Sequence, residues 1–270
     1  LNGLSHWPNE LASAEGAPAV DRNALLVAAD MLRAGLAGSI RDYRLHTADG
    51  STQRLDALRF GDAPAGYVSE PAEVVNYVEN HDNETLFDIN AYKLPLTATF
   101  DERARAQMLG IALVTLAQGT PYLHAGMEML RSKSMDRNSY HSGDWFNVLD
   151  FTYGTNGFAR GLPIEHENRR NWPQIDPLLN SAFVKPDTQS ILWTLGAAED
   201  LLAIRASTRL LRLRTAADIR RRLRFWNVGP SQNPCLLFAD IDGSELPGES
   251  YGRLLYVINA CRGAVLFGDT

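Results

Sequence analysis

The sequence has the composition of an ordinary globular protein, since 45% of its 270 residues are hydrophobic, 21% are charged and the net charge is −6. A mildly acidic chain lacks the basic surface that nucleic-acid binding requires, so no nucleic-acid partner is expected. No apolar run is long enough to predict a membrane span.

The amino-terminal part of the chain has the least regular pattern. Residues 1–13 show no basic region followed by an apolar core, so no targeting signal is expected there, and the compartment stays open. Helical spacing of apolar residues predicts an amphipathic helix over Asp21–Leu36, formed by Ala24, Val27, Ala28, Met31 and Leu32. A loop containing Pro and Gly, residues 62–71, leads the chain to the next strand.

The run VVNYVENHDNETLFD, residues 74–88, is the most informative stretch. Its first residues are apolar and β-rich, and they predict a strand that ends where the pattern turns polar at His81 and Asp82. Barrel enzymes carry their chemistry at the carboxyl ends of strands, which makes this pair a candidate site. From spacing alone, a structural cap or turn is the commoner explanation of such a pair.

A helix and a strand are expected next. Thr99 and Glu102 form a capping-box pattern that predicts the start of a helix over residues 100–118. Its apolar face would contain Ala104, Met108, Ile111, Ala112 and Thr115. Gly119 would end the helix, and residues 120–124 read as the next strand of a barrel.

The carboxy-terminal part predicts a long helix and a hairpin. Residues 189–213 read as a helix with one shared face made of Ala197, Leu201, Ile204, Thr208 and Leu211. The runs 235–241 and 253–259 predict two strands joined as a hairpin of a β-sandwich. The basic cluster Arg220, Arg221, Arg222 and Arg224 is interpreted as a solvated turn at a helix end.

Cys235 and Cys261 lie in these strand-like runs and lack the spacing of a metal site. They could pair across a sheet in an oxidising compartment. Two buried free thiols are the favoured interpretation.

The residues around the His-Asp pair, VENHDNETLFDINAYK, resemble the third-carboxylate motif of starch-debranching enzymes of the pullulanase and limit-dextrinase type. These enzymes belong to the α-amylase clan. A second segment, residues 119–151, resembles the stretch that follows the eighth barrel strand in these enzymes. Weaker similarity continues through most of residues 30–260. The resemblance implies the carboxy-terminal part of a (β/α)8 barrel over residues 1–215, followed by the start of an all-β sandwich domain over residues 216–270.

The resemblance also implies retaining hydrolysis of α-1,6-glucosidic bonds in an α-glucan, such as pullulan or a dextrin from starch or glycogen. Asp82 matches the third carboxylate of the family, which stabilises the transition state, and His81 matches the histidine that contacts the same sugar. No segment before Asp82 resembles the motifs of the nucleophile or the general acid. We therefore expect this chain to be a fragment of a longer enzyme and to be inactive and prone to aggregate alone.

Asn138 and Tyr140, in RNSY, align with a sugar-binding loop of pullulanases and are the substrate-binding candidates there. Many relatives have an acidic residue where Asn138 stands, which puts the strength of that contact in question. Tyr140 could stack on a glucose or simply anchor the loop.

No metal is assigned. The family sometimes carries calcium at positions that this sequence does not define, and the spacing of His124, Glu128 and Asp136 fits no tight ligand pattern. Arg131, Trp145 and Asn147 are at least as plausibly packing or loop-fixing residues, and Trp172 is interpreted as a loop anchor.

Two alternatives to a debranching enzyme stay open. One is a carbohydrate-binding remnant that has lost catalysis. The other is a different clan member, such as an α-1,4-active amylase or an isoamylase.

Overall fold

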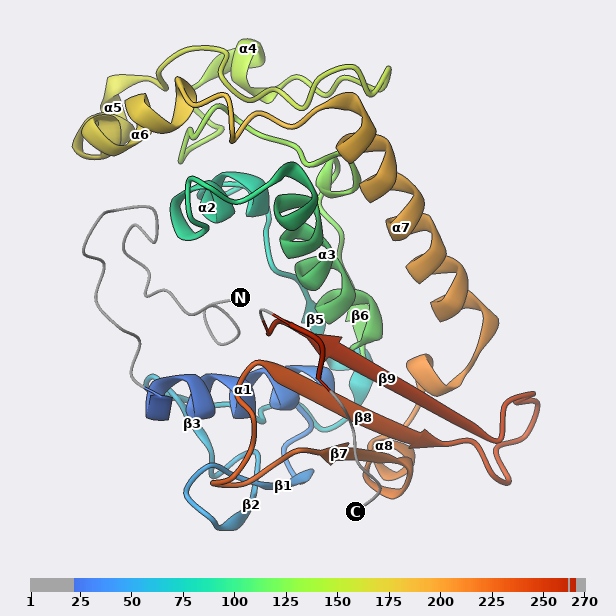
Figure 1. Cartoon of the computed structure of the whole chain (residues 1–270). Helices are drawn as coiled ribbons and strands as arrows, with labels where there is room; N and C mark the ends of the chain where they lie inside the picture. The colour runs from blue at the N-terminus through green and yellow to red at the C-terminus, as the bar shows by residue number, and fades with distance from the viewer. Residues whose placement is uncertain (1–21, 262, 266–270) are drawn as a thin grey trace.

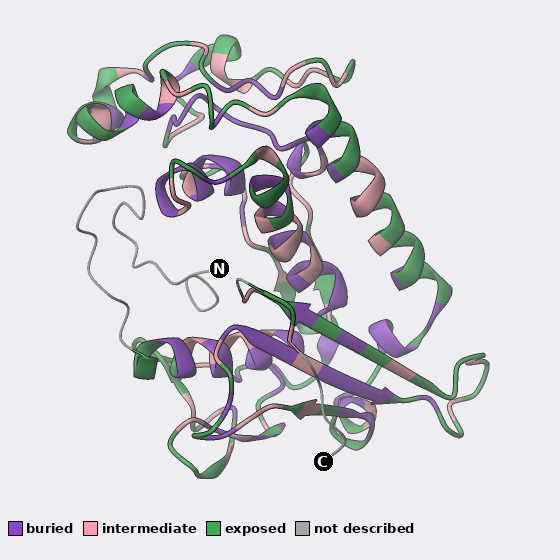
Figure 2. Ribbon diagram, viewed as in Figure 1, coloured by how far each residue is buried: buried purple, intermediate pink, exposed green. Residues whose placement is uncertain are grey.

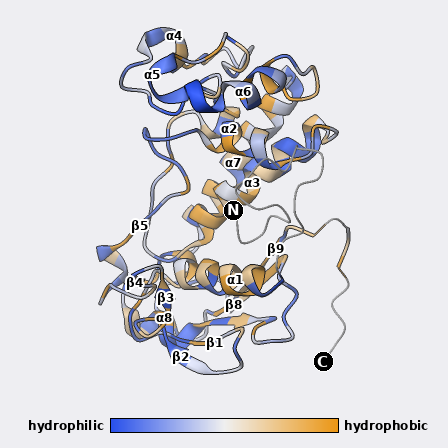
Figure 3. Cartoon of the chain, turned by 90° about the vertical axis from the view of Figure 1, so that its left-hand side faces the viewer, coloured by the Kyte–Doolittle hydropathy of each residue, from blue (hydrophilic) through white to orange (hydrophobic). Residues whose placement is uncertain are grey.

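The computed structural model describes residues 22–261 and 263–265 (Figure 1). The carboxy-terminal sheet and the first helix form its lower part in the view of Figure 1, and two central helices stand above them. Long loops with short helices form the upper part, and one long helix runs down the side. Hydrophobic residues gather on the first helix and on the longer central helix, whereas the upper loops carry many hydrophilic residues (Figure 3).

Helix α1, Arg22–Leu36, confirms that a helix forms here, but the predicted face was wrong, because Ala24 and Val27 are exposed. The buried residues of α1 are Leu25, Leu26, Ala29, Asp30, Arg33, Ala34 and Leu36. Its buried side shares a core with the carboxy-terminal sheet (Figure 2). The Arg33 guanidinium is fully buried and donates to Gln232 Oε1 at 2.5 Å and to the carbonyl oxygen of Asn227 at 2.7 Å. Because a buried charge is tolerated only with partners, these bonds fix α1 against the segment between two strands of that sheet.

Two short antiparallel pairs carry the chain from α1 toward the His-Asp motif. Strand β1, Arg44–His46, pairs with β2, Thr52–Arg54, and β3, Arg59–Phe60, pairs with β4, Ala63–Pro64. The 3-10 helix η1, Pro71–Glu73, precedes the next strand.

A parallel pair of strands lies at the centre. Strand β5, Val75–Asn76, pairs in parallel with β6, Thr120–Pro121, and the crossover between them contains α2, Leu86–Lys93, and α3, Phe100–Leu116. The expected capping box at Thr99 and Glu102 is confirmed. Gly119 has φ +97° and a Cβ there would lie 2.5 Å from a methyl group of Val74, so only glycine fits this turn into β6.

The upper loops have a core of their own. They contain η2 (Met127–Met129), α4 (Gly143–Asn147), α5 (Glu165–Asn168), η3 (Arg169–Asn171) and α6 (Trp172–Leu179). Phe87 of α2 meets Phe158 edge to face, with ring centroids 5.6 Å apart, among Ile175 and Leu178 of α6. Trp172 Nε1 donates to the carbonyl oxygen of Pro163 at 2.9 Å, as a loop anchor would. This core holds the loops onto α2.

Helix α7, Thr188–Ser207, is shorter than expected and turns a partly different face inward. Its buried residues are Ser190, Ile191, Thr194, Ala198 and Arg205. The predicted face was right in part, because Thr208 and Leu211 are buried, although both follow the end of the helix. Within α7, Leu201 is half-buried against a core cluster, Ala197 is half-buried and Ile204 is exposed. The helix packs on α3, and Arg205 donates to the carbonyl oxygens of Thr115, Ala117 and Gly119 at 2.7–2.8 Å. The end of α3 thus sets the rotation of α7.

After the 3-10 helix η4, Leu210–Arg212, and α8, Ala216–Arg222, the chain forms an antiparallel sheet. Strand β7, Leu223–Trp226, pairs with β8, Leu236–Asp242, which pairs along its length with β9, Arg253–Asn259. The expected hairpin is confirmed. The interpretation of the basic cluster was wrong for Arg222, which is buried and donates to the carbonyl oxygens of Asp242 and Ser244 at 3.1 and 2.8 Å.

Cys235 and Cys261 form a disulfide, so the favoured interpretation as free thiols was wrong. The pairing of β8 and β9 brings their Cα atoms to 5.1 Å, within the range that a disulfide needs. The bridge joins the residue before β8 to the second residue after β9, at the open end of the hairpin.

The described residues therefore form a mixed α/β structure with a small antiparallel sheet at its end, and their strands do not close into a barrel. Val75 in β5, Tyr77 directly after β5 and Tyr122 directly after β6 are exposed. Within the same residues, no helix has both the length and the apolar character needed to cross a membrane.

Candidate functional site

His81 and Asp82 lie in the loop after β5, and Asp82 is bridged to the loop after β6 that contains Asn138. Their side chains are 76% and 68% exposed, and His81 Nε2 lies 3.7 Å from Asp82 Oδ1. The backbone of Asp82 forms a β-bridge with Asn138, and its amide donates to Asn80 Oδ1 at 2.8 Å. A solvent-facing carboxylate therefore stands on a backbone that is fixed on two sides.

A buried polar chain connects the ends of β5 and β6 next to this loop. His124 Nδ1 lies 2.8 Å from Glu79 Oε1, and Arg131 Nη1 donates to His124 Nε2 at 3.2 Å. Because a guanidinium can only donate, Nε2 must accept, and we assign the ring proton to Nδ1, which donates to Glu79. The second Glu79 oxygen accepts the backbone amide of Leu86 at the start of α2. Both strand ends and α2 are thereby held in one arrangement.

Asp88 of α2 is fully buried and holds the loop after η2. It accepts from Ser132 Oγ at 2.5 Å and from the backbone amide of Lys133 at 2.8 Å. Burial raises the pKa of the Asp88 carboxyl to about 6, and the bonds from Ser132 and Lys133 oppose this shift.

Asn138 and Tyr140 lie on the loop that faces Asp82. Asn138 Nδ2 donates to Glu167 Oε1 at 2.6 Å, while its Oδ1 accepts the backbone amide of Tyr140 at 2.9 Å. The Tyr140 side chain is 86% exposed, and its ring meets that of His141 edge to face at 4.8 Å. The structure thus brings three of the four candidates to one place: Asp82 and His81 on one loop, and Asn138 opposite them. Tyr140 projects into solvent from the same second loop.

Several neighbours in this area are not found by sequence reasoning. Glu167 lies 29 residues after Asn138, and the ring of His166 lies 5.1 Å from that of His141. Only folding of α5 against the loop brings these residues together. Glu79, in contrast, lies three positions before Asp82 inside the same motif, and a charged residue directly after the run VVNYV was the available signal.

The loop-fixing interpretation of Arg131, Trp145 and Asn147 agrees with their contacts. Arg131 Nη2 donates to the carbonyl oxygen of Asn147 at 3.1 Å, and Asn147 Nδ2 donates to that of Ser139 at 3.0 Å. Trp145 Nε1 donates to the carbonyl oxygen of Arg160 at 3.0 Å. These bonds determine the path of the loop beside Asp82.

Comparison with known proteins shows that this chain is similar to pullulanases. Residues 153–269 match the family described as "Alpha-1,6-glucosidases, pullulanase-type, C-terminal". The chain is 41% identical over 268 residues to Pullulanase 1, chloroplastic, of Arabidopsis thaliana, which covers 96% of this chain and 28% of the relative. It is 36% identical over 225 residues to a pullulanase of Klebsiella aerogenes, covering 83% of this chain and 20% of the relative.

The fold is similar as well. The apo pullulanase from Klebsiella pneumoniae superposes with a TM-score of 0.87 and 33% identity, over 96% of this chain and 28% of that one. The chain matches the carboxy-terminal portion of pullulanases. It spans about a quarter of the length of these relatives. A Klebsiella pneumoniae pullulanase complexed with maltotriose superposes equally well, with a TM-score of 0.87, 33% identity and coverage of 96% of this chain and 24% of that one.

His124, Glu128 and Asp136, which were weighed as metal ligands, each bind a different protein group. His124 pairs with Glu79, Glu128 accepts the backbone amide of Gly126, and Asp136 accepts from Asn168 Nδ2. Among the residues that the structure describes, no three His, Cys, Asp or Glu side chains lie close enough to hold a metal ion.

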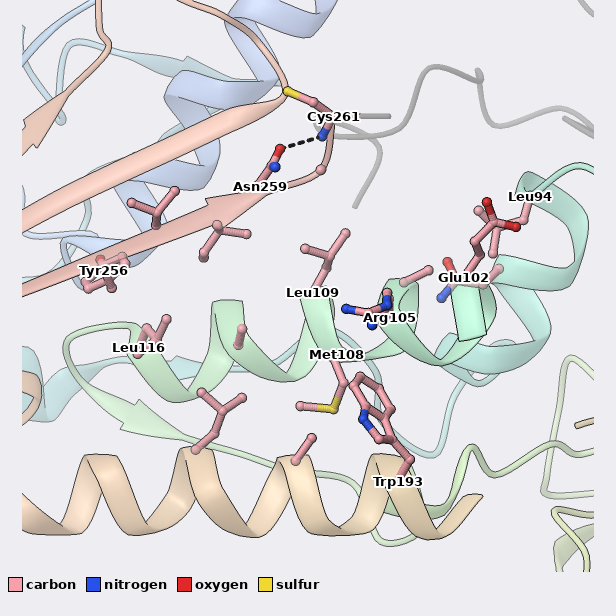
Figure 4. A pocket seen from close by; sticks show the side chains of 18 of the residues that line it. Leu94, Glu102, Arg105, Met108, Leu109, Leu116, Trp193, Tyr256, Asn259 and Cys261 are labelled. Atoms are coloured by element: carbon pink, nitrogen blue, oxygen red, sulfur yellow. Dashed lines mark hydrogen bonds between the residues drawn. The ribbon is translucent and has the colours of Figure 1, made fainter. Parts of the chain in front are cut away.

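A large groove of about 1300 Å³ lies away from this pullulanase motif, between α3, α7 and β9 (Figure 4). Met108, Leu109 and Trp193 line it, and Arg105 lies over the Trp193 ring at 5.4 Å. None of the four candidate residues lines it. The candidate site is instead an open surface.

Proposed function

We propose that this chain forms part of a longer retaining glycoside hydrolase that cleaves α-1,6-glucosidic branch linkages in pullulan or in dextrins from starch and glycogen. One observation carries the proposal: Asp82 and His81 stand exposed at the carboxyl end of β5, bridged to Asn138, in a chain that matches pullulanases. This is the place where a barrel enzyme gathers its catalytic side chains.

Asp82 would act as the transition-state stabiliser. Its carboxylate accepts hydrogen bonds from sugar hydroxyls beside the cleaved bond, and these bonds strengthen as the ring flattens toward an oxocarbenium ion. Only the part of this contact that is stronger in the transition state raises the rate. His81 would donate to a hydroxyl of the same sugar, and Asn138 and Tyr140 would contact a neighbouring glucose unit.

The nucleophile and the general acid would come from a part of the enzyme outside this chain. Residues 1–215 would then contribute the last strands and helices of a (β/α)8 barrel, and residues 216–270 the start of a β-sandwich domain. The parallel pairing of β5 and β6 through a helical crossover supports the first assignment, and the β7–β8–β9 sheet supports the second. The exposed Val75 and Tyr77 would pack against the missing strands, so the isolated chain is expected to be inactive and prone to aggregate.

The substrate class follows from the same match. A Klebsiella pneumoniae pullulanase has been crystallised with maltotriose, which makes an α-glucan the expected partner of this chain. Calcium stays an expectation of family resemblance, and no step of the mechanism depends on it.

The proposal is tested in the complete protein that contains this chain, with pullulan and amylose as substrates. Asp82→Asn keeps the size of the side chain and removes its charge, and it should lower kcat/KM on pullulan by at least about 100-fold. Asp200→Asn, which removes an exposed carboxylate from α7, is the matched control and should change it less than about 2-fold.

Each of the other outcomes would favour a different function. Preferential cleavage of amylose would replace the debranching assignment with an α-1,4-active enzyme. Glucan binding without hydrolysis by the complete protein would favour a non-catalytic carbohydrate-binding remnant. Unchanged turnover in Asp82→Asn would remove Asp82 from the mechanism.

A further inference from the structure

Lys133 is a fully buried lysine with an unusual set of partners. Its Nζ donates to the carbonyl oxygen of Asn83 at 2.6 Å and to Ser139 Oγ at 2.8 Å. A buried ammonium is costly unless its donors are satisfied, and burial lowers the pKa of this group. The two hydrogen bonds from Nζ therefore offset the cost of burying the ammonium.

These two partners belong to the two loops of the candidate site. Asn83 follows Asp82 and adopts a left-handed backbone with φ 58°. Ser139 follows Asn138, and its hydroxyl donates onward to the carbonyl oxygen of His81 at 3.0 Å. The ammonium therefore reaches the residue after Asp82 directly and the residue before it through the Ser139 hydroxyl.

The backbone that carries Lys133 is itself held in place by Asp88. The backbone amide of Lys133 donates to Asp88 Oδ2 at 2.8 Å, and Ser132 Oγ donates to Asp88 Oδ1 at 2.5 Å. Asp88 belongs to α2, whose first turn also holds Glu79 through the Leu86 amide. The bonds from Lys133 are thus built on the same helix that supports the end of β5.

We propose that Lys133 is a positioning residue that clamps the Asp82 loop to the Asn138 loop through Asn83 and Ser139, and so sets where the Asp82 carboxylate meets substrate. This role rests on the proposed function, because it acts through Asp82. Because Lys133 has no exposed surface, it would act through these two loops and not by contacting substrate. Loss of the clamp takes the ammonium donor away from the carbonyl oxygen of the exposed Asn83 and from the half-buried Ser139 hydroxyl, and the two loops can then shift against each other. A displacement of about 1 Å at a reacting group can cost about 100-fold in rate.

The first test is kinetic and uses the complete protein with pullulan. Lys133→Met keeps most of the side-chain volume and removes the donors, and it should lower kcat about 30- to 100-fold with less than about 3-fold change in KM. In an Asp82→Ala background the same substitution should cost less than about 3-fold, because the residue that it positions is gone. An equal loss in both backgrounds would overturn the positioning role. Lys93→Met, which replaces another buried lysine at the carboxyl end of α2 and outside both loops, is the control and should keep kcat within about 2-fold.

The second test does not depend on activity. Hydrogen exchange of the amides at 81–84 and 138–140 should become at least about 10-fold faster in Lys133→Met, while the amides of α3 keep their rates. Unchanged exchange at both loops would overturn the clamp. If the wild-type protein hydrolyses no α-1,6 linkage, the proposed function fails, and this exchange result still decides whether the clamp exists.

A milder variant keeps the question answerable if Lys133→Met does not fold. Ser139→Ala leaves the ammonium and its bond to Asn83 in place and breaks only the relay to His81. It should lower kcat about 5- to 10-fold and speed exchange at 81–84. No effect on either quantity would contradict the relay.

Discussion

The disulfide between Cys235 and Cys261 gives a stability prediction whose size follows from the chain length that it closes. The two residues are 26 positions apart, and cross-linking a loop of this length removes conformational entropy from the unfolded chain. The chain-entropy relation gives about 3.5 kcal/mol at 25 °C for such a loop. The double variant Cys235→Ala, Cys261→Ala should therefore make local opening of the β8–β9 hairpin easier by about this amount.

Hydrogen exchange measures this opening directly in the complete protein. Amides in the centre of the β8–β9 pairing, such as that of Tyr256, should exchange roughly 300-fold faster in the double variant, since each 1.4 kcal/mol is a factor of ten. The wild-type protein treated with a thiol reductant should reach the same rate. Reductant should leave the double variant unchanged, and the amides of α3 serve as the internal reference.

Two results would refute the reasoning. The bridge does not form if a thiol reagent labels both cysteines in native protein that was never treated with reductant. If the bridge forms but reduction changes the exchange of β8 and β9 less than about 3-fold, the hairpin does not open as one unit, and the loop-entropy argument fails.

Three further predictions concern other contacts. Burial holds the Asp88 pKa near 6, above the value of about 3.8 in the unfolded chain, so the contribution of this group to stability is complete below pH 4 and is lost as the pH rises to 6. Relative to Asp88→Asn, the free energy of unfolding of the wild type should fall by about 3 kcal/mol across this window, as measured by urea titration at each pH. Parallel pH profiles of the two proteins would contradict the shift. Arg205→Met should destabilise the fold by about 3–5 kcal/mol in the same assay, because three carbonyl oxygens at the end of α3 lose a charged donor, and a loss below about 1 kcal/mol would show that water replaces it. Asn138→Asp places two carboxylates in contact at Glu167 and should raise KM for pullulan about 5-fold, whereas the double variant with Glu167→Gln should restore it; equal KM values in all three proteins would remove the contact from substrate binding.

Local elements were predictable because their signals lie close together in the chain. The capping box at Thr99 and Glu102 places the start of α3 within one turn, and two short apolar runs identify β8 and β9. The face of α7 was not predictable in the same way. Its apolar residues surround much of the helix, and the partners of Arg205 at the end of α3 decide which side turns inward.

In the candidate site, too, a local motif points to some residues, whereas other contacts form only on folding. The motif around His81 and Asp82 identifies the residues, and the strand before them identifies the exposed edge where they stand. The bond between Asn138 and Glu167, the bond from Lys133 to Asn83 and the disulfide join residues separated by 26 to 50 positions. No local pattern encodes such contacts.

By itself, the sequence determined the family and the order of most elements, and it supplied the candidate residues of the proposed site, because these depend on short motifs and on residue spacing. Only the tertiary structure decided which buried groups hold those residues in place and whether the two cysteines pair. Each of these contacts forms when strands and loops distant in the chain are packed side by side, and its geometry exists only after that packing.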